Sequence, residues 1–197
     1  MATQVAATPA SYPLRFDVQY PQQLSRGLIF VKWLLAVPHL LILNALGNLQ
    51  GIIILIAFFA ILFTRKFPPG LFDLYVRASR WAANVIAYAG FFRDEYPPFG
   101  WEAGQYPPVT YEVEYPPQLS RWMILVKWLL AFPHYIVLAV LFFVSVFVWI
   151  IAWFAILFTG RFPRGLFDFL VGVLRWGYRV QIYVVLLRDE YPPFSTA

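Results

Sequence analysis

The strongest constraint on the fold is an internal repeat that runs along nearly the whole chain. The segment QYPQQLSRGLIFVKWLLAVPH, which begins at Gln19, aligns without a gap with EYPPQLSRWMILVKWLLAFPH, which begins at Glu114. The same offset aligns AFFAILFTRKFPPGLFD with AWFAILFTGRFPRGLFD, and FRDEYPPF with LRDEYPPF. Such self-similarity predicts two copies of one structural unit. We therefore expect a short flexible tail over residues 1–13, a first module over 14–99, a linker over 100–108 and a second module over 109–197.

The composition indicates that a lipid bilayer is the main solvent of this chain. Hydrophobic residues make up 61% of the sequence and charged residues only 13%, whereas soluble domains carry about 25% charged residues. The formal charge of +5 is interleaved with apolar runs and forms no continuous basic patch. This pattern argues against nucleic acid as a partner and favours anionic phospholipid headgroups. The absence of cysteine excludes disulfides, thiolate catalysis and cysteine-ligated metals, and we expect no metal site.

Each module begins with a short run of alternating polarity. These runs are LRFDVQY from Leu14 to Tyr20 and VTYEVEY from Val109 to Tyr115. A period of two is typical of a strand. The two runs are able to pair across a pseudo-twofold axis between the modules.

A long apolar stretch follows, and in the second copy it extends from Trp122 to Phe158 with only Lys127 and His134 ionisable. At about 1.5 Å per residue it is longer than a hydrocarbon core of about 30 Å. One interpretation breaks the helix at the Pro-His step, which leaves an interfacial helix followed by a spanning helix over residues 39–63 or 134–158. The other is a hairpin that turns at residues 44–50. We favour the break, because residues 51–63 are too few to span and the second copy has no turn residues at that place.

The start of this stretch carries a polar stripe with a spacing of seven residues, which keeps its members on one helix face. The stripe consists of Ser25, Lys32 and His39 in the first copy and of Ser120, Lys127 and His134 in the second. The favoured interpretation is an interfacial anchor whose lysines reach lipid headgroups. Alternatively, the two histidines face each other across the axis and ligate a haem or the magnesium of a pigment.

The last helix of each module, expected over residues 71–92 and 166–187, carries a second polar stripe. It consists of Asp73, Arg77 and Arg80 in the first copy and of Asp168, Arg175 and Arg179 in the second. An arginine facing acyl chains costs about 2.5 to 3.5 kcal/mol. Either these arginines lie among headgroups, which we favour, or Asp73–Arg80 and Asp168–Arg175 pairs form part of an inter-repeat polar core or a lipid-phosphate pocket.

These segments together predict an all-α integral membrane protein of two tandem repeats. Each repeat is expected to have about two membrane-spanning helices, a Pro-bent interfacial helix and a short strand-like segment. An even number of crossings per module gives both copies the same orientation, and an odd number gives inverted repeats. The even number is favoured. The closing RDEYPPF of each copy has the composition of an anchor at headgroup level.

Three stretches of the second copy carry a family resemblance. LSRWMILVKWLLAFPH, AILFTGRFPRGLFDFLVGVLRW and RDEYPPF resemble the domain of unknown function 4389 family, and the resemblance covers each copy once. It implies a multi-pass protein of the bacterial cytoplasmic membrane. It implies no assigned activity and no functional residues.

The predicted function is that of a non-enzymatic structural or accessory subunit of a membrane complex, or of a homo-oligomer. An anionic-lipid-binding or small transport module is one alternative, and a haem- or pigment-binding protein is another. Catalysis is not expected, because no His-Asp pair is placed to activate a hydroxyl and neither HExxH nor GxSxG occurs. The hydroxyls in question belong to Ser25, Ser120, Thr64 and Thr159.

Overall fold

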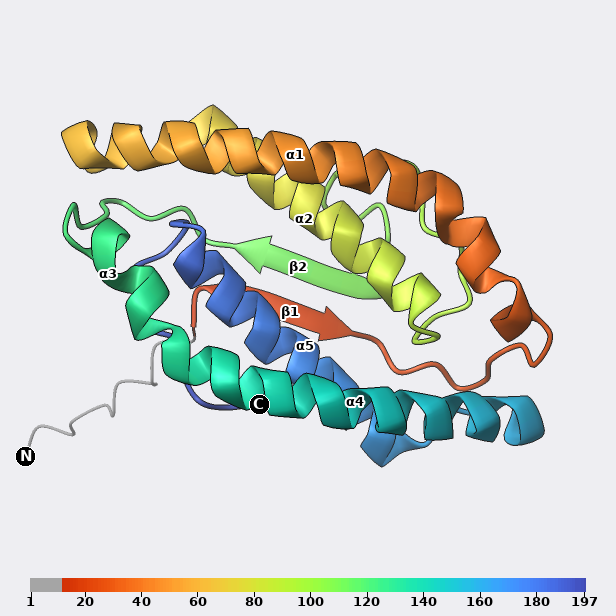
Figure 1. Ribbon diagram of the computed structural model, residues 1–197. Coiled ribbons are helices and arrows are strands. Elements are labelled where there is room, and N and C mark those ends of the chain that lie inside the picture. The colour runs from red at the N-terminus through yellow and green to blue at the C-terminus, as the bar shows by residue number, and fades with distance from the viewer. Residues whose placement is uncertain (1–11) are drawn as a thin grey trace, which may run out of the picture.

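Two short strands meet at the centre of the molecule in the computed structural model, which describes residues 12–197 (Figure 1). The predicted tail over residues 1–13 therefore lies outside the described residues, apart from its last two. Strand β1, Leu14–Val18, pairs antiparallel with β2, Val109–Val113. Phe16 lies opposite Tyr111 in this register. The predicted pairing of the two alternating runs is confirmed.

A pseudo-twofold axis relates the two modules and passes between Phe16 and Tyr111, which hold equivalent positions in the repeat. Contacts between the modules occur in reciprocal pairs, as in an isologous interface. Two backbone hydrogen bonds of 2.8 Å form one such pair: Leu24 N to Gly160 O, and Leu119 N to Arg65 O.

The first long helix, α1, extends without interruption over Lys32–Thr64 and contains Pro38; a short 3-10 turn, Leu28–Phe30, precedes it. The alternative hairpin is excluded, because residues 44–50 are helical throughout. In the first module the expected break at the Pro-His step is therefore wrong.

The corresponding stretch of the second module is divided into α3, Met123–Leu130, and α4, Phe132–Thr159. Here an interruption is present, but it is the single residue Ala131, two residues before the expected Pro-His step, and Pro133 lies in the first turn of α4. Proline is tolerated at that place because the first N–H groups of a helix have no partner inside it.

A second, amphipathic helix completes each module. These helices are α2, Pro69–Ala89, and α5, Arg164–Val184. Among the described residues only α1 and the stretch Met123–Thr159 are long and apolar enough to cross a membrane. The prediction of about two such helices per module is therefore wrong, because α2 and α5 use their apolar faces to build the core and carry the predicted Asp-Arg stripes.

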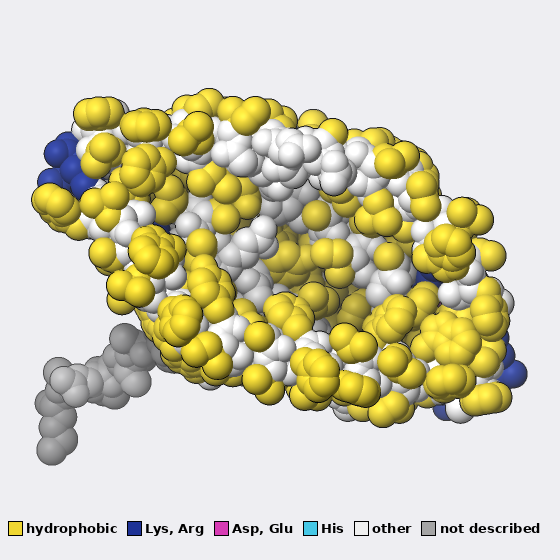
Figure 2. All heavy atoms as spheres, viewed as in Figure 1, with side chains coloured by type: hydrophobic (Ala, Val, Ile, Leu, Met, Phe, Trp, Pro, Cys, Tyr) yellow, Lys and Arg dark blue, Asp and Glu magenta, His cyan; other side chains and the backbone are white. Residues whose placement is uncertain are grey.

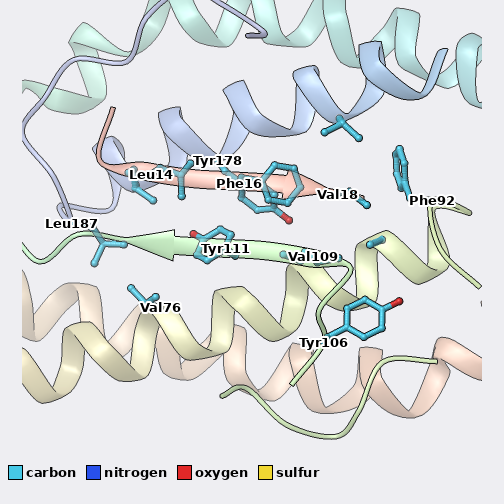
Figure 3. Packing of buried hydrophobic residues seen from close by; sticks show 14 of the residues in the cluster. Leu14, Phe16, Val18, Val76, Phe92, Tyr106, Val109, Tyr111, Tyr178 and Leu187 are labelled. Atoms are coloured by element: carbon cyan, nitrogen blue, oxygen red, sulfur yellow. The ribbon is translucent and has the colours of Figure 1, made fainter. Parts of the chain in front are cut away.

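The core lies between the strands and the amphipathic helices (Figure 3). Helix α2 packs on β2 and α5 packs on β1, so each module covers the strand of the other. The long helices then pack on the outside, α1 on α2 and α4 on α5. The buried strand side chains are Leu14, Phe16, Val18, Val109 and Tyr111. The alternate positions, Arg15, Asp17, Thr110 and Glu112, are exposed on the opposite face.

The long helices leave most of their apolar surface uncovered. In their most apolar windows only 17% of α1 and 11% of Met123–Thr159 is buried. The face over α1, α3 and α4 shows mostly hydrophobic side chains, with a white patch along the middle of α1 and with Lys and Arg visible near its two ends (Figure 2). The middle of this face is hollowed (Figure 2). Two adjoining cavities of about 550 and 480 Å³ lie between α4, α5 and α2 and share Ile86, Phe142 and Leu174.

Candidate functional site

The Ser-Lys-His stripe of each module is covered by the closing segment of the same module. In the first module the Lys32 Nζ lies 2.7 Å from the Asp94 Oδ1 and donates to the Arg93 carbonyl at 2.6 Å. The second carboxylate oxygen of Asp94 accepts from the backbone N–H of Ser25 at 2.5 Å. The ion pair thus fastens the RDEYPPF segment across the start of α1.

The second module repeats this arrangement. The Lys127 Nζ lies 2.7 Å from the Asp189 Oδ1 and donates to the Arg188 carbonyl at 2.7 Å. The Asp189 Oδ2 accepts from the backbone N–H of Ser120 at 2.6 Å. Lys127 also lies over the Tyr183 ring, 5.2 Å from its centroid. We call the two arrangements the lysine clamps.

The clamps correct the prediction that Lys32 and Lys127 reach lipid headgroups. Both side chains are buried, with exposed fractions of 0% and 1%. A buried ammonium needs a counter-charge and hydrogen-bond acceptors, and the closing segment supplies both. RDEYPPF, which the sequence suggested as a headgroup anchor, therefore makes its strongest polar contacts inside the protein.

Each histidine lies in an aromatic cluster of its own module. His39 Nδ1 accepts from the Trp81 indole at 3.1 Å, and the imidazole stacks on Phe99 with ring centroids 4.0 Å apart. In the second module His134 Nδ1 accepts from Trp176 at 3.0 Å. The equivalent stacking partner there is Phe194, at 3.9 Å.

This geometry does not suit the expected haem or pigment ligation. An imidazole whose Nδ1 accepts a hydrogen bond carries its proton on Nε2 when it is neutral. A ligating histidine instead offers a lone pair and donates its other N–H to a neighbour. The Nε2 atoms of His39 and His134 are buried without a hydrogen-bond partner in the described part of the chain. The aromatic contacts of each ring also belong to its own module, so the two rings do not stack on one another.

The arginines at the centre of the second stripe hold the two modules together. Arg80 donates through Nε to the Tyr111 carbonyl at 3.0 Å and through Nη1 to the Trp101 carbonyl at 2.9 Å. Its equivalent, Arg175, donates through Nε to the Phe16 carbonyl at 2.9 Å. Each guanidinium therefore reaches the strand of the other module beside the pseudo-twofold axis.

The acids of this stripe pair differently from the prediction. Asp73 bonds to Arg77 at 2.7 Å, and Asp168 bonds to Arg164 at 3.0 Å, both within one turn of the helix. The alternative that paired Asp73 with Arg80 and Asp168 with Arg175 is therefore wrong in its partners, although Arg80 and Arg175 do make the inter-repeat contact of that alternative instead of the favoured contact with headgroups. Backbone carbonyls of the strands are the partners, and sequence spacing alone does not reveal them.

Three further arginines, one in the first module and two in the second, fasten the ends of the modules. Arg77 also pairs with Glu102, which ties the predicted linker to α2, and Arg179 donates to the Ser195 carbonyl at 3.3 Å. Arg188 donates two N–H groups to Glu190, at 2.9 and 2.6 Å. This bidentate bond holds the pKa of the Glu190 carboxyl below its ordinary value.

Further basic residues gather at the two ends of the long axis, where Figure 2 shows dark blue atoms. Among them Arg164 keeps its bond to Asp168, and Arg121 donates to the Phe63 carbonyl at 2.9 Å. At one end a cavity of about 320 Å³ is lined by Arg65, Ser120, Arg121 and Trp122, among others. Trp122 is 79% exposed, and no acidic side chain lines this cavity. We call these surfaces the basic ends; they consist of Arg65, Lys66 and Arg121 at one end and of Arg26, Arg161 and Arg164 at the other.

A comparison with known protein families tests the family resemblance of the sequence motifs. The model of the family described as domain of unknown function (DUF4389) matches residues 26–100 and again residues 121–196. The chain belongs to this family. The DUF4389 matches begin just before each long helix and end with the closing segment, so each contains the lysine and the aspartate of one clamp, one histidine cluster and both arginines of one stripe. No curated protein and no solved structure matches the chain.

Proposed function

We propose that this DUF4389 protein is a non-enzymatic component of the bacterial cytoplasmic membrane. In this proposal it acts as a structural or accessory subunit, either of a larger complex or of a homo-oligomer. The observation that carries the proposal is the uncovered apolar surface of α1 and α4. Contiguous apolar patches of more than a few hundred Å² mark contact with a membrane or another protein. Large apolar side chains are exposed along the whole length of both helices.

The use of the polar residues supports a structural role. The lysines of the first stripe are held by the closing segments, and Arg80 and Arg175 are held by the strands of the opposite module. These groups fasten the fold. Thr64 and Thr159 donate to carbonyls one helical turn earlier, at 2.7 and 2.6 Å.

The middle of α1 supports an assembly. Gly47 and Gly51 are exposed, and a Cβ added at either would meet nothing within 4 Å. The amide side chains of Asn44 and Asn48 are exposed beside them. In membranes, small residues allow two helices to approach closely, and amides form hydrogen bonds across the contact. The Asn48 amide already donates to the Asn44 carbonyl at 3.1 Å, and a second copy or another subunit that packs here would bond to the remaining amide groups.

Two measurements test the proposal. The chain should remain in the membrane fraction after alkaline carbonate extraction, and its release into the supernatant would contradict membrane embedding. Crosslinking in native membranes should then capture an oligomer or a partner. Gly47→Leu should reduce that product several-fold, while Val146→Leu in α4 is the matched control. A chain that is always recovered as a lone monomer would contradict the accessory role.

A second candidate function is the binding of anionic phospholipid, and the basic ends favour it. Each end combines three cationic side chains with the end of an apolar helix, as expected where phosphate groups meet acyl chains. Arg65→Gln combined with Arg121→Gln should lower the amount of phosphatidylglycerol retained in native mass spectrometry. Arg15→Gln, on the exposed face of β1, is the control. Equal retention in both variants would contradict lipid binding at this end.

A further inference from the structure

We propose that the protein lies within one leaflet of the bilayer, with α1 and α4 in the membrane plane and the pseudo-twofold axis along the membrane normal. The proposal names the surface that contacts lipid, and it rests on the membrane embedding proposed above. It also makes neither long helix a crossing segment, although both are long enough for that.

The symmetry of the molecule limits the possible orientations. Helices α1 and α4 run in opposite directions on the two sides of the axis (Figure 1). If they crossed the bilayer as an antiparallel pair, an axis that exchanges them would lie in the bilayer midplane. Phe16 and Tyr111 face each other at this axis. In a crossing arrangement the two strands would therefore lie at the middle depth of the hydrocarbon core.

The strands carry charges that are incompatible with that depth. Arg15 and Asp17 flank Phe16, and Glu112 follows Tyr111, all on the exposed face of the sheet. The Asp17 side chain is 66% exposed even though it pairs with an arginine. Charged side chains are the most costly residues to place at the bilayer centre, and those found there normally face the protein interior or water. The crossing arrangement would instead turn them toward acyl chains.

The in-plane arrangement places the charged layer in water and the apolar layer in hydrocarbon, and the exposed Asn44 and Asn48 of α1 then lie in the assembly contact proposed above. The exposed face of the sheet meets water, α2 and α5 lie beneath it, and α1 and α4 lie deepest. A helix with its side chains is about 10 to 12 Å across, which fits within one half of a hydrocarbon core of about 30 Å. The face shown in Figure 2, where no acidic side chain is visible, then points into the leaflet. Acyl chains fill its central hollow, whose two cavities are almost wholly apolar.

The length of the helices and the position of the charges at their ends agree with this arrangement. Helix α1 has 33 residues, which is about 50 Å and well above one hydrocarbon thickness. The basic ends lie at both ends of the long axis and therefore at one membrane surface, where they reach headgroups of the same leaflet. Both modules then have the same orientation toward the membrane with no crossing at all.

The absence of cysteine makes a direct test possible. Three single-cysteine variants report on the axis and on the two ends: Thr110→Cys on the exposed face of β2, Lys66→Cys after α1, and Arg161→Cys at the equivalent place after α4. Each is treated with a membrane-impermeant maleimide in right-side-out and in inside-out vesicles from the expressing cells. Carbonate extraction of the same vesicles measures embedding separately.

The in-plane arrangement predicts that all three cysteines are labelled in the same vesicle orientation and at least tenfold less in the other. Labelling of Lys66→Cys and Arg161→Cys from opposite sides would overturn it while leaving the membrane proposal intact. Protection of Thr110→Cys in both orientations would also overturn it. Release of the chain by carbonate would overturn the membrane proposal itself, together with this inference.

Discussion

Replacing Asp189 by asparagine removes the counter-charge of Lys127 and almost nothing else. The amide keeps the shape of the carboxylate and an oxygen that accepts from Ser120. The Lys127 ammonium, however, is 1% exposed and loses the partner that stabilises its charge. The Lys127 Nζ keeps its hydrogen bond to the Arg188 carbonyl and its position over the Tyr183 ring. These contacts reduce the free-energy cost of removing Asp189, but they supply no negative charge.

The size of the effect follows from the burial of the pair. Breaking a buried ion pair by removing one partner costs about 3 to 5 kcal/mol. The Asp189 side chain is 25% exposed, so water can partly reach the vacated position, and the lower value of about 3 kcal/mol applies. For a chain of this length, each kcal/mol lowers Tm by about 2 to 4 °C. Asp189→Asn should therefore lower Tm by about 6 to 12 °C.

The measurement is thermal unfolding of the purified protein in detergent, followed by tryptophan fluorescence. The double variant Lys127→Met, Asp189→Asn should recover most of the loss, because replacing both partners of a buried pair by neutral groups of similar size is close to neutral. Asp94→Asn provides an independent repeat in the other module. A Tm change below about 3 °C for Asp189→Asn, or a double variant as unstable as the single one, would refute the ion-pair argument.

Three further predictions concern the modules and their ends. Arg80→Gln and Arg175→Gln each remove charge-assisted bonds worth about 1.5 to 3 kcal/mol to carbonyls; they should lower Tm without reducing lipid retained in native mass spectrometry, and a selective loss of lipid would contradict their fastening role. Arg65 and Gly160 follow α1 and α4 and have positive φ angles of 61° and 69°, which glycine adopts without strain. Arg65→Gly should therefore stabilise the protein by up to about 1 kcal/mol, and Gly160→Ala should destabilise it by a similar amount. A stabilising Gly160→Ala would refute the argument that positive φ strains a residue other than glycine here. Because the folded-state pKa of Glu190 is lowered, its contribution to stability is present above pH about 4.3 and is lost as the pH falls through the folded-state pKa. Tm should therefore fall as the pH is lowered through this range, and it should fall less steeply in Glu190→Gln. An equal fall in both proteins would exclude this carboxylate as a cause.

The sequence by itself determined the local structure and its duplication. Alternating polarity located both strands to within two residues, and the breaker residues located α2 and α5 to within a few residues at either end. These features depend on near neighbours along the chain, so a single sequence contains them. The family relationship followed from long motifs that occur twice. The interruption near proline differed between the copies, since a helix can either contain a proline in its interior, as α1 contains Pro38, or hold it in its first turn, as α4 holds Pro133.

The tertiary structure decided which side chains meet. A spacing of seven residues placed Lys32 and His39 on one helix face, but it could not show that the closing segment covers that face with Asp94. Likewise, the stripe placed Arg80 near Asp73, while the fold gave Arg80 a strand carbonyl of the other module. Two similar copies are compatible with many mutual orientations. The antiparallel pairing of β1 with β2 selects the twofold one, and that symmetry sets the orientation of the long apolar helices relative to the charged face of the sheet.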